Sequence, residues 1–423
     1  MPVTVEEASA ITLRSIAALA EEEVKIADAF GRVLSHDVKS EVVLPPWNNA
    51  GMDGYAVRAM DFETATLPMM LPVSGTIAAG AKNVPPLQEL TAMRIMTGAP
   101  LPVGADSVIR IEDTDRGTTT VEIRDARDLK KNVRYRGDEL AIGDVVARAG
   151  SMITPAHVGL LASVGCSRVR AHKVPRVAVL ASGDELVDLD RFADVKAGHA
   201  IVSSNSYSIK AAALSAGATI ADYGIVRDDP RALANRIDAA RSSDLVITTG
   251  GVSVGAFDFT RDVIRQLGGE VLIDRVKMRP GAPMAFGLIQ GVPWLGLPGN
   301  PVSALATFEL FARPIIRRLR GERAIFPMPV PCVAGDEIEL AAPLTHFLRC
   351  TLAPDDDGDL VARLTGSQSS AQLSSMALAN ALLIVPGELT KVRIGERLAA
   401  LPIGDGPRSE RLRLSLYAPA PTE

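Results

Sequence analysis

The sequence has few cysteines and few aromatic residues, and these shortages exclude several classes of protein. Its three cysteines, Cys166, Cys332 and Cys350, lie far apart and show no Cys-x-x-Cys spacing. We therefore expect neither a structural zinc site nor a framework of disulfide bonds. Aromatic residues make up 4% of the chain, too few for the stacking surfaces that bind single-stranded nucleic acid.

The chain also lacks an excess of basic residues and a long apolar run. Its formal net charge is -5, which argues against a general nucleic-acid-binding surface. No apolar run approaches the roughly 20 residues that span a bilayer. The amino terminus has no basic segment followed by an apolar core, so no secretory signal is expected. These features predict a cytoplasmic protein that binds neither nucleic acid nor membranes.

The length and the changing pattern of the sequence predict several domains. A chain of 423 residues is long enough for roughly two to four domains. The pattern Thr-x-x-Glu at Thr4 to Glu7 predicts a capping box that begins a helix through Ala20. From residue 70 to residue 149, short apolar runs are broken by glycine, proline and aspartate, which indicates small β-rich modules.

From residue 176 onward the sequence alternates between short apolar runs and amphipathic segments. Helix starts are predicted at Asn205, Asp229 and Asn300, the last two followed by proline, and the last helix should kink or end at Pro314. Alternating strands and helices imply a doubly wound, mostly parallel sheet. After residue 321 short strand-like runs return, which predicts a separate β-barrel-like domain.

A glycine-rich segment between a predicted buried strand and a predicted helix is the strongest local motif. Glycine allows the backbone to turn tightly, and successive N–H groups at a helix start attract an anion. A tight turn without any ligand is the alternative. The candidate ligand-binding residues in this segment are Gly250, Gly251, Ser253 and Gly255.

Two further polar loops follow other predicted strands of the same sheet. Residues 182–185 follow the first strand, and residues 296–303 lie between a strand and a helix. Because parallel strands end at one edge of a sheet, the three loops should converge on one ligand that carries phosphate. The candidates in the later loop are Pro298, Gly299, Asn300 and Ser303.

Charged residues lie in or beside these loops. Mg²⁺ prefers one or two carboxylates together with phosphate oxygens, so Glu185, Asp228 and Asp258 are candidates, although each could instead cap a helix. Arg275 and Arg279, with a lysine between them, would share one face of an extended segment. They form either a cationic patch for the anionic ligand or a solvated strand edge.

The ordered set of motifs resembles the molybdopterin molybdenumtransferase family, which includes the C-terminal region of gephyrin. The matching stretches occur in the family order over nearly the whole chain. They are residues 45–58, 94–100, 134–144, 182–186, 250–258, 279–287 and 296–304.

The resemblance implies an enzyme of molybdenum cofactor biosynthesis and a four-part α/β fold. Such an enzyme binds adenylylated molybdopterin, breaks its pyrophosphate bond with the help of Mg²⁺, inserts molybdenum from molybdate and releases AMP. We expect a small α-containing domain from residues 1–22 and 138–172 and a β-rich domain from residues 23–137. A central α/β domain of doubly wound, mostly parallel sheet should occupy residues 173–322, and a C-terminal β-barrel domain residues 323–417.

The resemblance also assigns roles to particular residues. Arg279 stands where the family has a lysine, and Arg349 and Ser370 match the C-terminal pair associated with molybdate, so all three are assigned to molybdate. Glu185 and Asp258 are assigned to Mg²⁺. Glu139 is included because Gly137-Asp138-Glu139 stands where the family often has Gly-Glu-Asp. The catalytic candidates are Asp53, Thr97, Glu139, Glu185, Asp228 and Asp258.

The same resemblance predicts a homodimer whose two active sites each draw residues from both chains. Molybdopterin adenylyltransferase and recipient molybdoenzymes are further expected partners. Two alternative functions stay open: a non-catalytic binding or scaffold protein, and a paralogue that hydrolyses another nucleotide pyrophosphate. The pair Arg349 and Ser370 favours molybdate over the second alternative.

Overall fold

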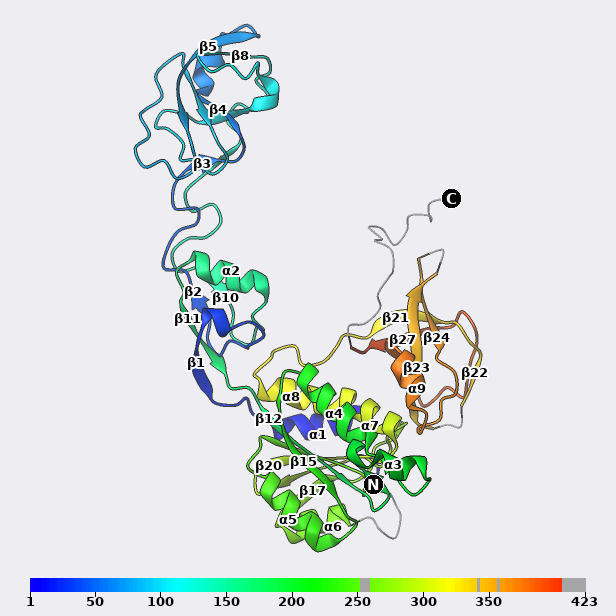
Figure 1. Ribbon diagram of the computed structural model, residues 1–423. Coiled ribbons are helices and arrows are strands. Elements are labelled where there is room, and N and C mark those ends of the chain that lie inside the picture. Colours follow the sequence, from blue (N-terminus) through cyan, green and yellow to red (C-terminus); the bar gives the residue numbers. More distant parts are fainter. Residues whose placement is uncertain (252–258, 341–342, 356–357, 405–423) are drawn as a thin grey trace.

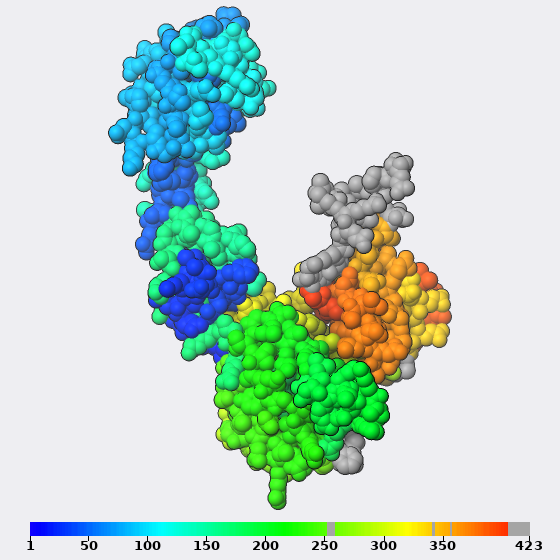
Figure 2. Space-filling model, in the orientation of Figure 1, coloured from blue at the N-terminus to red at the C-terminus, as the bar shows by residue number. Residues whose placement is uncertain are grey.

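The computed structural model describes residues 1–251, 259–340, 343–355 and 358–404. Figure 1 shows a bent, elongated molecule in which a β domain lies at the far end of an arm, a small domain forms the arm, and an α/β domain and a barrel form the body. In Figure 2 the arm stands clear of the barrel. The predicted multidomain α/β fold is confirmed.

A six-stranded sheet forms the centre of the α/β domain. Its strand order is β15-β12-β16-β20-β19-β17. The first four strands are parallel, whereas β19 is antiparallel to both of its neighbours. The strands are β12 (Arg176–Ser182), β15 (Thr219–Val226), β16 (Leu245–Thr249), β17 (Gly269–Ile273), β19 (Ala285–Ile289) and β20 (Val292–Leu297).

Helices cover both faces of this sheet. One face packs against α1 (Val5–Arg14), α4 (Ser204–Ser215), α7 (Pro301–Thr307) and α8 (Arg313–Leu319). The other face packs against α5 (Pro230–Ala240) and α6 (Thr260–Gln266). Strand residues alternate between the two cores, with Val177 and Val179 in one and Ala178 and Leu180 in the other. Burial on both faces explains why the strand runs are almost wholly apolar.

The helix that follows Asn300 was predicted to kink or end at Pro314, and in the structure it does not end there. It continues as a π-helical turn, Phe308–Ala312, and then as α8 to Leu319. A proline ring inside a helix presses on the carbonyl one turn earlier and donates no hydrogen bond. A wider turn before the proline makes room for the ring, so the chain stays helical.

The first helix belongs to the α/β domain rather than to the small domain. Thr4 and Glu7 form the predicted capping box, with the Thr4 N–H donating to Glu7 at 2.8 Å and the Glu7 N–H donating to Thr4 at 3.1 Å. However, α1 ends at Arg14, and Ala8 and Ile16 pack into the α/β core. The assignment of residues 1–22 to the small domain is therefore wrong, because a helix pattern identifies an apolar face but not its partner.

Two separate segments of the chain build the small domain that forms the arm. β1 (Glu21–Lys25) pairs with β11 (Arg168–His172), β2 (Val38–Lys39) pairs with β10 (Val145–Ala147), and α2 (Pro155–Ser163) packs beside them. Val24, Ala29 and Leu34 lie in this core, so the segment after residue 22 was wrongly assigned to the β-rich domain.

The β domain at the end of the arm contains a five-stranded sheet of order β7-β4-β6-β5-β8. A short pair, β3 with β9, lies where the chain enters and leaves it. Separate apolar clusters cover the two faces of the sheet. The strands are β3 (Asn49–Ala50), β4 (Gly54–Val57), β5 (Met69–Ile77), β6 (Ala92–Ile95), β7 (Ser107–Arg110), β8 (Thr120–Ile123) and β9 (Val133–Arg134).

The C-terminal domain is a closed five-stranded barrel. β23 pairs with both β24 and β25, which closes the order β23-β24-β21-β27-β25. A strand of the preceding domain, β18 (Met278–Arg279), pairs with β23 and joins the barrel to the α/β domain. The barrel strands are β21 (Val330–Ala334), β23 (Thr345–Pro354), β24 (Leu360–Leu364), β25 (Ala381–Val385) and β27 (Arg397–Pro402), and α9 is Leu373–Leu378.

Three short elements complete the surroundings of the cleft described below. β13 (Leu186–Val187) and β14 (Ile201–Val202) form a parallel pair beside β12, and α3 (Phe192–Lys196) connects them. Within the part of the chain that the structure describes, no helix combines the length and apolarity needed to cross a membrane.

Candidate active site

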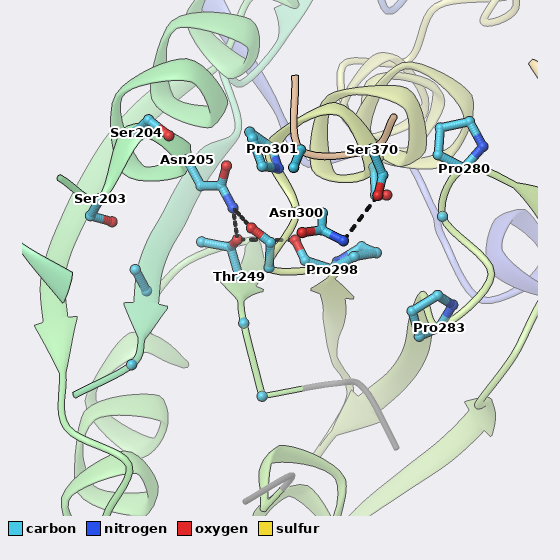
Figure 3. A pocket seen from close by; sticks show the side chains of 18 of the residues that line it. Ser203, Ser204, Asn205, Thr249, Pro280, Pro283, Pro298, Asn300, Pro301 and Ser370 are labelled. Atoms are coloured by element: carbon cyan, nitrogen blue, oxygen red, sulfur yellow. Dashed lines mark hydrogen bonds between the residues drawn. The ribbon is translucent and has the colours of Figure 1, made fainter. Parts of the chain in front are cut away.

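A cleft opens where the parallel strands β12, β15, β16 and β20 end. Its volume is about 1150 Å³, slightly above the roughly 300–1,000 Å³ typical of small-molecule sites. The loops that follow the strands form one side, and residues 278–283 with residues 368–371 of the barrel form the other. Figure 3 shows these loops from close by. The predicted convergence of three loops is present in the structure.

Two glycines at the end of β16 allow the backbone of this turn to lie close to its neighbours. Gly250 has φ +89° and Gly251 has φ +64°, conformations that residues with a side chain rarely adopt. A Cβ on Gly250 would lie 2.4 Å from the Ser182 carbonyl oxygen, and one on Gly251 would lie 2.5 Å from Thr260 Oγ1. The positive φ and the close contacts both require glycine at these two positions, and both residues line the cleft.

Asn205 connects three of the surrounding loops instead of capping its helix as predicted. It lies inside α4, and Ser203 occupies the N-cap position. Its Nδ2 donates to Thr249 Oγ1 at 2.7 Å and to the Gly299 carbonyl at 2.8 Å. The side chain is 8% exposed. Asn205 therefore joins the start of α4 to the glycine turn and to the loop before α7 (Figure 3).

Two of the three predicted carboxylates of the α/β domain line the cleft. Glu185 is exposed, and Asp228 is half-buried and accepts a hydrogen bond from Ser182 Oγ at 2.6 Å. Ser253, Gly255 and Asp258 lie outside the described residues. Among the residues that the structure does describe, no three His, Cys, Asp or Glu side chains gather in the manner of a protein-only metal cluster.

The barrel contributes a serine-rich loop to the cleft. Ser370 lines it together with Gln368, Ser369 and Ala371. Asn300 Nδ2 donates to Ser370 Oγ at 3.0 Å, and the Val302 N–H donates to the Ser370 carbonyl at 3.1 Å. Figure 3 shows the bond from Asn300. Together the two bonds hold the loop against the start of α7.

Arg349 lies behind this loop and not in the cleft. Its side chain is 0% exposed. Nε donates to Ser375 Oγ at 3.1 Å, and the terminal nitrogens donate to three carbonyls of the loop at 2.9–3.2 Å, those of Ser367, Gln368 and Ser369. Burial lowers the pKa of the guanidinium below its usual value. Arg349 thus positions the loop that carries Ser370.

The two predicted arginines around residue 277 separate in the structure. Arg279 is exposed in the cleft, where it is the one cationic side chain among the described lining residues. Arg275 instead borders a small hollow beside Met1 and Val3. The interval between the two arginines is not one continuous strand, because only Met278 and Arg279 pair with the barrel. Ala282 also lines the cleft.

The remaining predicted catalytic residues lie far in space from the cleft of their own chain. Asp53 Oδ1 accepts from the Thr97 hydroxyl at 2.6 Å and from the Thr97 N–H at 2.7 Å, which lowers the pKa of the Asp53 carboxyl. Both residues belong to the β domain at the far end of the arm (Figure 1). Glu139 is exposed, and its N–H donates to the Leu44 carbonyl at 2.9 Å where the arm meets that domain.

Sequence patterns missed several cleft residues that the structure brings together. Gln368 and Ser369 were not singled out, Ser182 was named only as the first residue of the loop 182–185, and Asn205 was noticed only as a possible cap. Serines and amides after a predicted strand are common in any loop, so no signal distinguished them. The contact of Asn205 with Gly299 spans 94 residues of sequence and could not be inferred locally.

The fold and the cleft define a class of protein: a multidomain α/β protein with a cleft at the carboxyl edge of a parallel sheet, the place where such sheets bind ligands. Comparison with known families matches residues 3–165 to the MoeA N-terminal region (domain I and II). Residues 178–318 match a probable molybdopterin binding domain, and residues 332–403 match the MoeA C-terminal region (domain IV).

Similar proteins cover nearly the whole chain. Molybdopterin molybdenumtransferase 1 of Mycobacterium tuberculosis is 37% identical over 93% of this chain and 97% of its own length. Molybdopterin molybdenumtransferase of Haemophilus influenzae is 32% identical over 90% and 93%. The crystal structure of the molybdopterin biosynthesis MoeA protein of Pyrococcus horikoshii superposes with a TM-score of 0.81 at 26% identity, covering 95% of this chain and 100% of that one. The chain belongs to the molybdopterin molybdenumtransferase family.

Proposed function

We propose that the protein inserts molybdenum from molybdate into adenylylated molybdopterin and releases AMP. The observation that carries this proposal is that the glycine turn at Gly250 and Gly251 shares one cleft with Ser370 of the barrel. The turn suits a phosphate group, since glycine lets backbone N–H groups approach it. The barrel loop suits an oxyanion. A reaction that inserts the metal of an oxyanion into a pterin and breaks the pyrophosphate bond of the same pterin needs both sites side by side.

The carboxylates of the cleft fit a magnesium ion bound together with the pyrophosphate. Glu185 and Asp228 offer oxygen ligands on the cleft surface, and Mg²⁺ is usually held by one or two carboxylates plus phosphate oxygens and waters. Glu185 would hold the ion together with Asp258, the carboxylate that follows the glycine turn in the sequence. When bound, the ion neutralises charge on the phosphates. Cleavage of a phosphate bond depends mainly on such positioning and neutralisation, and the glycine turn orients the chain of phosphates.

Molybdate is a substrate, and the end of the cleft beside the barrel suits it. Arg279 supplies the exposed positive charge and Ser370 a hydroxyl. Arg349 acts through the loop: its buried charge lies directly behind the peptide groups of residues 367–369. Charge-assisted contacts of this kind are the strong ones for oxyanions.

The working unit is a homodimer in which the β domain of one chain completes the cleft of the other. Within one chain the pair Asp53 and Thr97 lies at the far end of the arm (Figure 1). The cleft is open on one side, and a second surface would exclude water from the pyrophosphate. Adenylylated substrate comes from a molybdopterin adenylyltransferase, and the product passes to recipient molybdoenzymes.

Direct measurement of AMP tests the proposal. Purified protein is incubated with adenylylated molybdopterin and Mg²⁺, with molybdate present in one series and absent in the other. We expect AMP and molybdenum-loaded pterin only in the series with molybdate. Absence of AMP from a folded dimer, with both substrates and Mg²⁺ present, would contradict the proposed reaction.

A further inference from the structure

The hydrogen bond between Asn300 and Ser370 determines where the proton of a hydroxyl group can point. Asn300 Nδ2 donates to Ser370 Oγ at 3.0 Å. An amide NH₂ group donates and does not accept. Ser370 Oγ is therefore the acceptor in this bond, and its own hydrogen is directed elsewhere.

Asn300 makes this contact instead of the usual one for its position. It occupies the N-cap of α7 but makes no side-chain cap hydrogen bond, whereas an asparagine there ordinarily accepts from an N–H of the first turn. The N–H of Val302, in that first turn, donates to the Ser370 carbonyl instead. Side chain and backbone of the helix start thus both bind Ser370.

The acceptors of the surrounding loop are already occupied. The carbonyls of Ser367, Gln368 and Ser369 accept from Arg349, and the carbonyl of Ser370 accepts from Val302. The loop therefore directs its four carbonyl oxygens toward Arg349 and Val302, and the hydroxyl hydrogen of Ser370, which the bond from Asn300 leaves unused, is a group that it can offer a ligand in the cleft.

We propose that Asn300 is a positioning residue that makes Ser370 a hydrogen-bond donor for a fully deprotonated tetrahedral oxyanion. The inference rests on the proposed function, which assigns molybdate to this end of the cleft. Molybdate carries no proton at neutral pH and accepts through every oxygen. Phosphate carries a proton that needs an acceptor, and Ser370 Oγ, with one of its two lone pairs already used by Asn300 and its hydrogen given to the ligand, is a poorer acceptor for that proton. Asn300 thereby favours molybdate over phosphate.

Two substitutions of Asn300 separate its effect on the direction of the Ser370 hydroxyl hydrogen from the effect of its size. Asn300→Asp replaces the donor with a carboxylate, which accepts the Ser370 hydrogen and turns a lone pair toward the anion. Asn300→Ala removes the donor and leaves the hydroxyl free to rotate. Molybdate affinity should fall in both variants and further in Asn300→Asp, while the preference for molybdate over phosphate should shrink.

A double-mutant cycle tests whether Asn300 acts through Ser370. Molybdate is titrated calorimetrically into the full-length protein without pterin, using Asn300→Ala, Ser370→Ala and the double variant. A hydrogen bond to a charged ligand is worth enough for Ser370→Ala to weaken binding roughly tenfold or more. Asn300→Ala should weaken it severalfold in wild type and have no further effect once Ser370 is alanine.

The neighbouring Ser369 offers the matched control. It lies in the same loop and also lines the cleft, so Asn300→Ala should keep its full effect in a Ser369→Ala background. Thermal unfolding checks that each variant folds. If Asn300→Ala does not fold, Asn300→Asp and Asn300→Ser complete the cycle.

The outcomes of this double-mutant cycle can be told apart from the outcomes of the AMP assay that tests the proposed reaction. Coupling between Asn300 and Ser370, with none to Ser369, supports the inference. Additive losses of affinity overturn the inference but do not contradict the proposed reaction that releases AMP. A wild-type protein that releases AMP but binds molybdate no better than it binds phosphate also overturns it, without contradicting the enzyme's assignment to pyrophosphate cleavage.

Discussion

Arg349 is a fully buried cation whose described partners are all neutral oxygens. Placing such a charge in the protein interior is costly unless hydrogen bonds and a nearby anion compensate it. Its planar group reaches three loop carbonyls in a way that a lysine ammonium cannot reproduce. This arrangement explains how a residue outside the cleft can control an anion inside it.

Replacing Arg349 by lysine should therefore impair molybdate use more than pterin binding. Lysine gives up at least one charge-assisted bond that holds the loop in place, worth roughly 1.5–3 kcal/mol. Because this loop presents Ser370 to the anion, the molybdate concentration for half-maximal activity should rise about tenfold. Steady-state AMP release at varied molybdate measures this. Arg363→Lys is the control, because Arg363 is an exposed arginine on the adjacent strand β24. A variant that loses pterin affinity but keeps its molybdate dependence would contradict the assignment.

Asp258 provides a second test of a single side chain. It follows the glycine turn in sequence and is proposed to bind Mg²⁺. Asp258→Asn should abolish AMP release without changing the thermal unfolding temperature, because an amide is a poor magnesium ligand of nearly the same size. Unchanged turnover would reduce Asp258 to a helix cap. Asp262→Asn, in the first turn of α6, is the matched control.

In the β domain, the end of strand β7 is anchored by an ion pair. Arg110 donates to Asp128 through Nε at 2.7 Å and through a terminal nitrogen at 2.8 Å. These bonds lower the pKa of the Asp128 carboxyl to about 2 from its ordinary 3.8. The Asp128 side chain is 2% exposed, whereas that of Arg110 is 35% exposed, so water partly screens the attraction.

This pair predicts a pH dependence of stability. A carboxyl whose pKa is lower in the folded state stabilises the fold above its unfolded pKa, and the contribution disappears as the pH falls through the folded value. The window is therefore pH 3.8 to about 2, and the contribution at neutral pH is at most about 2 kcal/mol.

Chemical unfolding of wild type and Asp128→Asn across pH 2–6 measures the effect. The difference in unfolding free energy should be constant above about pH 5 and should shrink toward pH 2. Asp125→Asn is the control, because the Asp125 side chain is 46% exposed. A difference that does not change with pH would show that Asp128 acts through packing alone.

The shape of the whole molecule places half of the predicted catalytic residues away from the cleft. The β domain with Asp53 and the α/β domain with Glu185 lie at opposite ends of the arm (Figure 1). A two-fold dimer repeats the same contacts on both sides, and such a dimer could bring each β domain to the other chain's cleft.

Subunit mixing tests this arrangement. We expect Asp53→Ala and Asp258→Ala each to be inactive as homodimers and to complement one another after exchange. In a mixed dimer one cleft carries both lesions and the other carries none. Random mixing makes half of the dimers mixed, so activity should recover to roughly a quarter of wild type. Zero recovery despite proven mixed dimers would place both residues in the same chain's site.

Local sequence patterns were sufficient for the four parallel strands of the central sheet and for much of the cleft, but not for the antiparallel strand β19. Buried parallel strands need apolar runs, and a backbone with positive φ at residues 250 and 251 needs glycine, so both leave a direct mark on the sequence. The prolines after Asp229 and Asn300 likewise mark the starts of α5 and α7. Those features depend on neighbours within a few residues, which is why they could be predicted.

Contacts between distant segments left no such mark. The periodicity of residues 5–14 identified a helix but not its place against the α/β core. The resemblance that singled out Arg349 did not indicate that it would be buried behind a loop. The alternating positions of Arg275 and Arg279 did not indicate that the two side chains would separate. The bond from Asn300 to Ser370 joins residues 70 positions apart. Burial and hydrogen-bond partners depend on which surfaces meet when the domains pack, and that is a property of the folded chain as a whole.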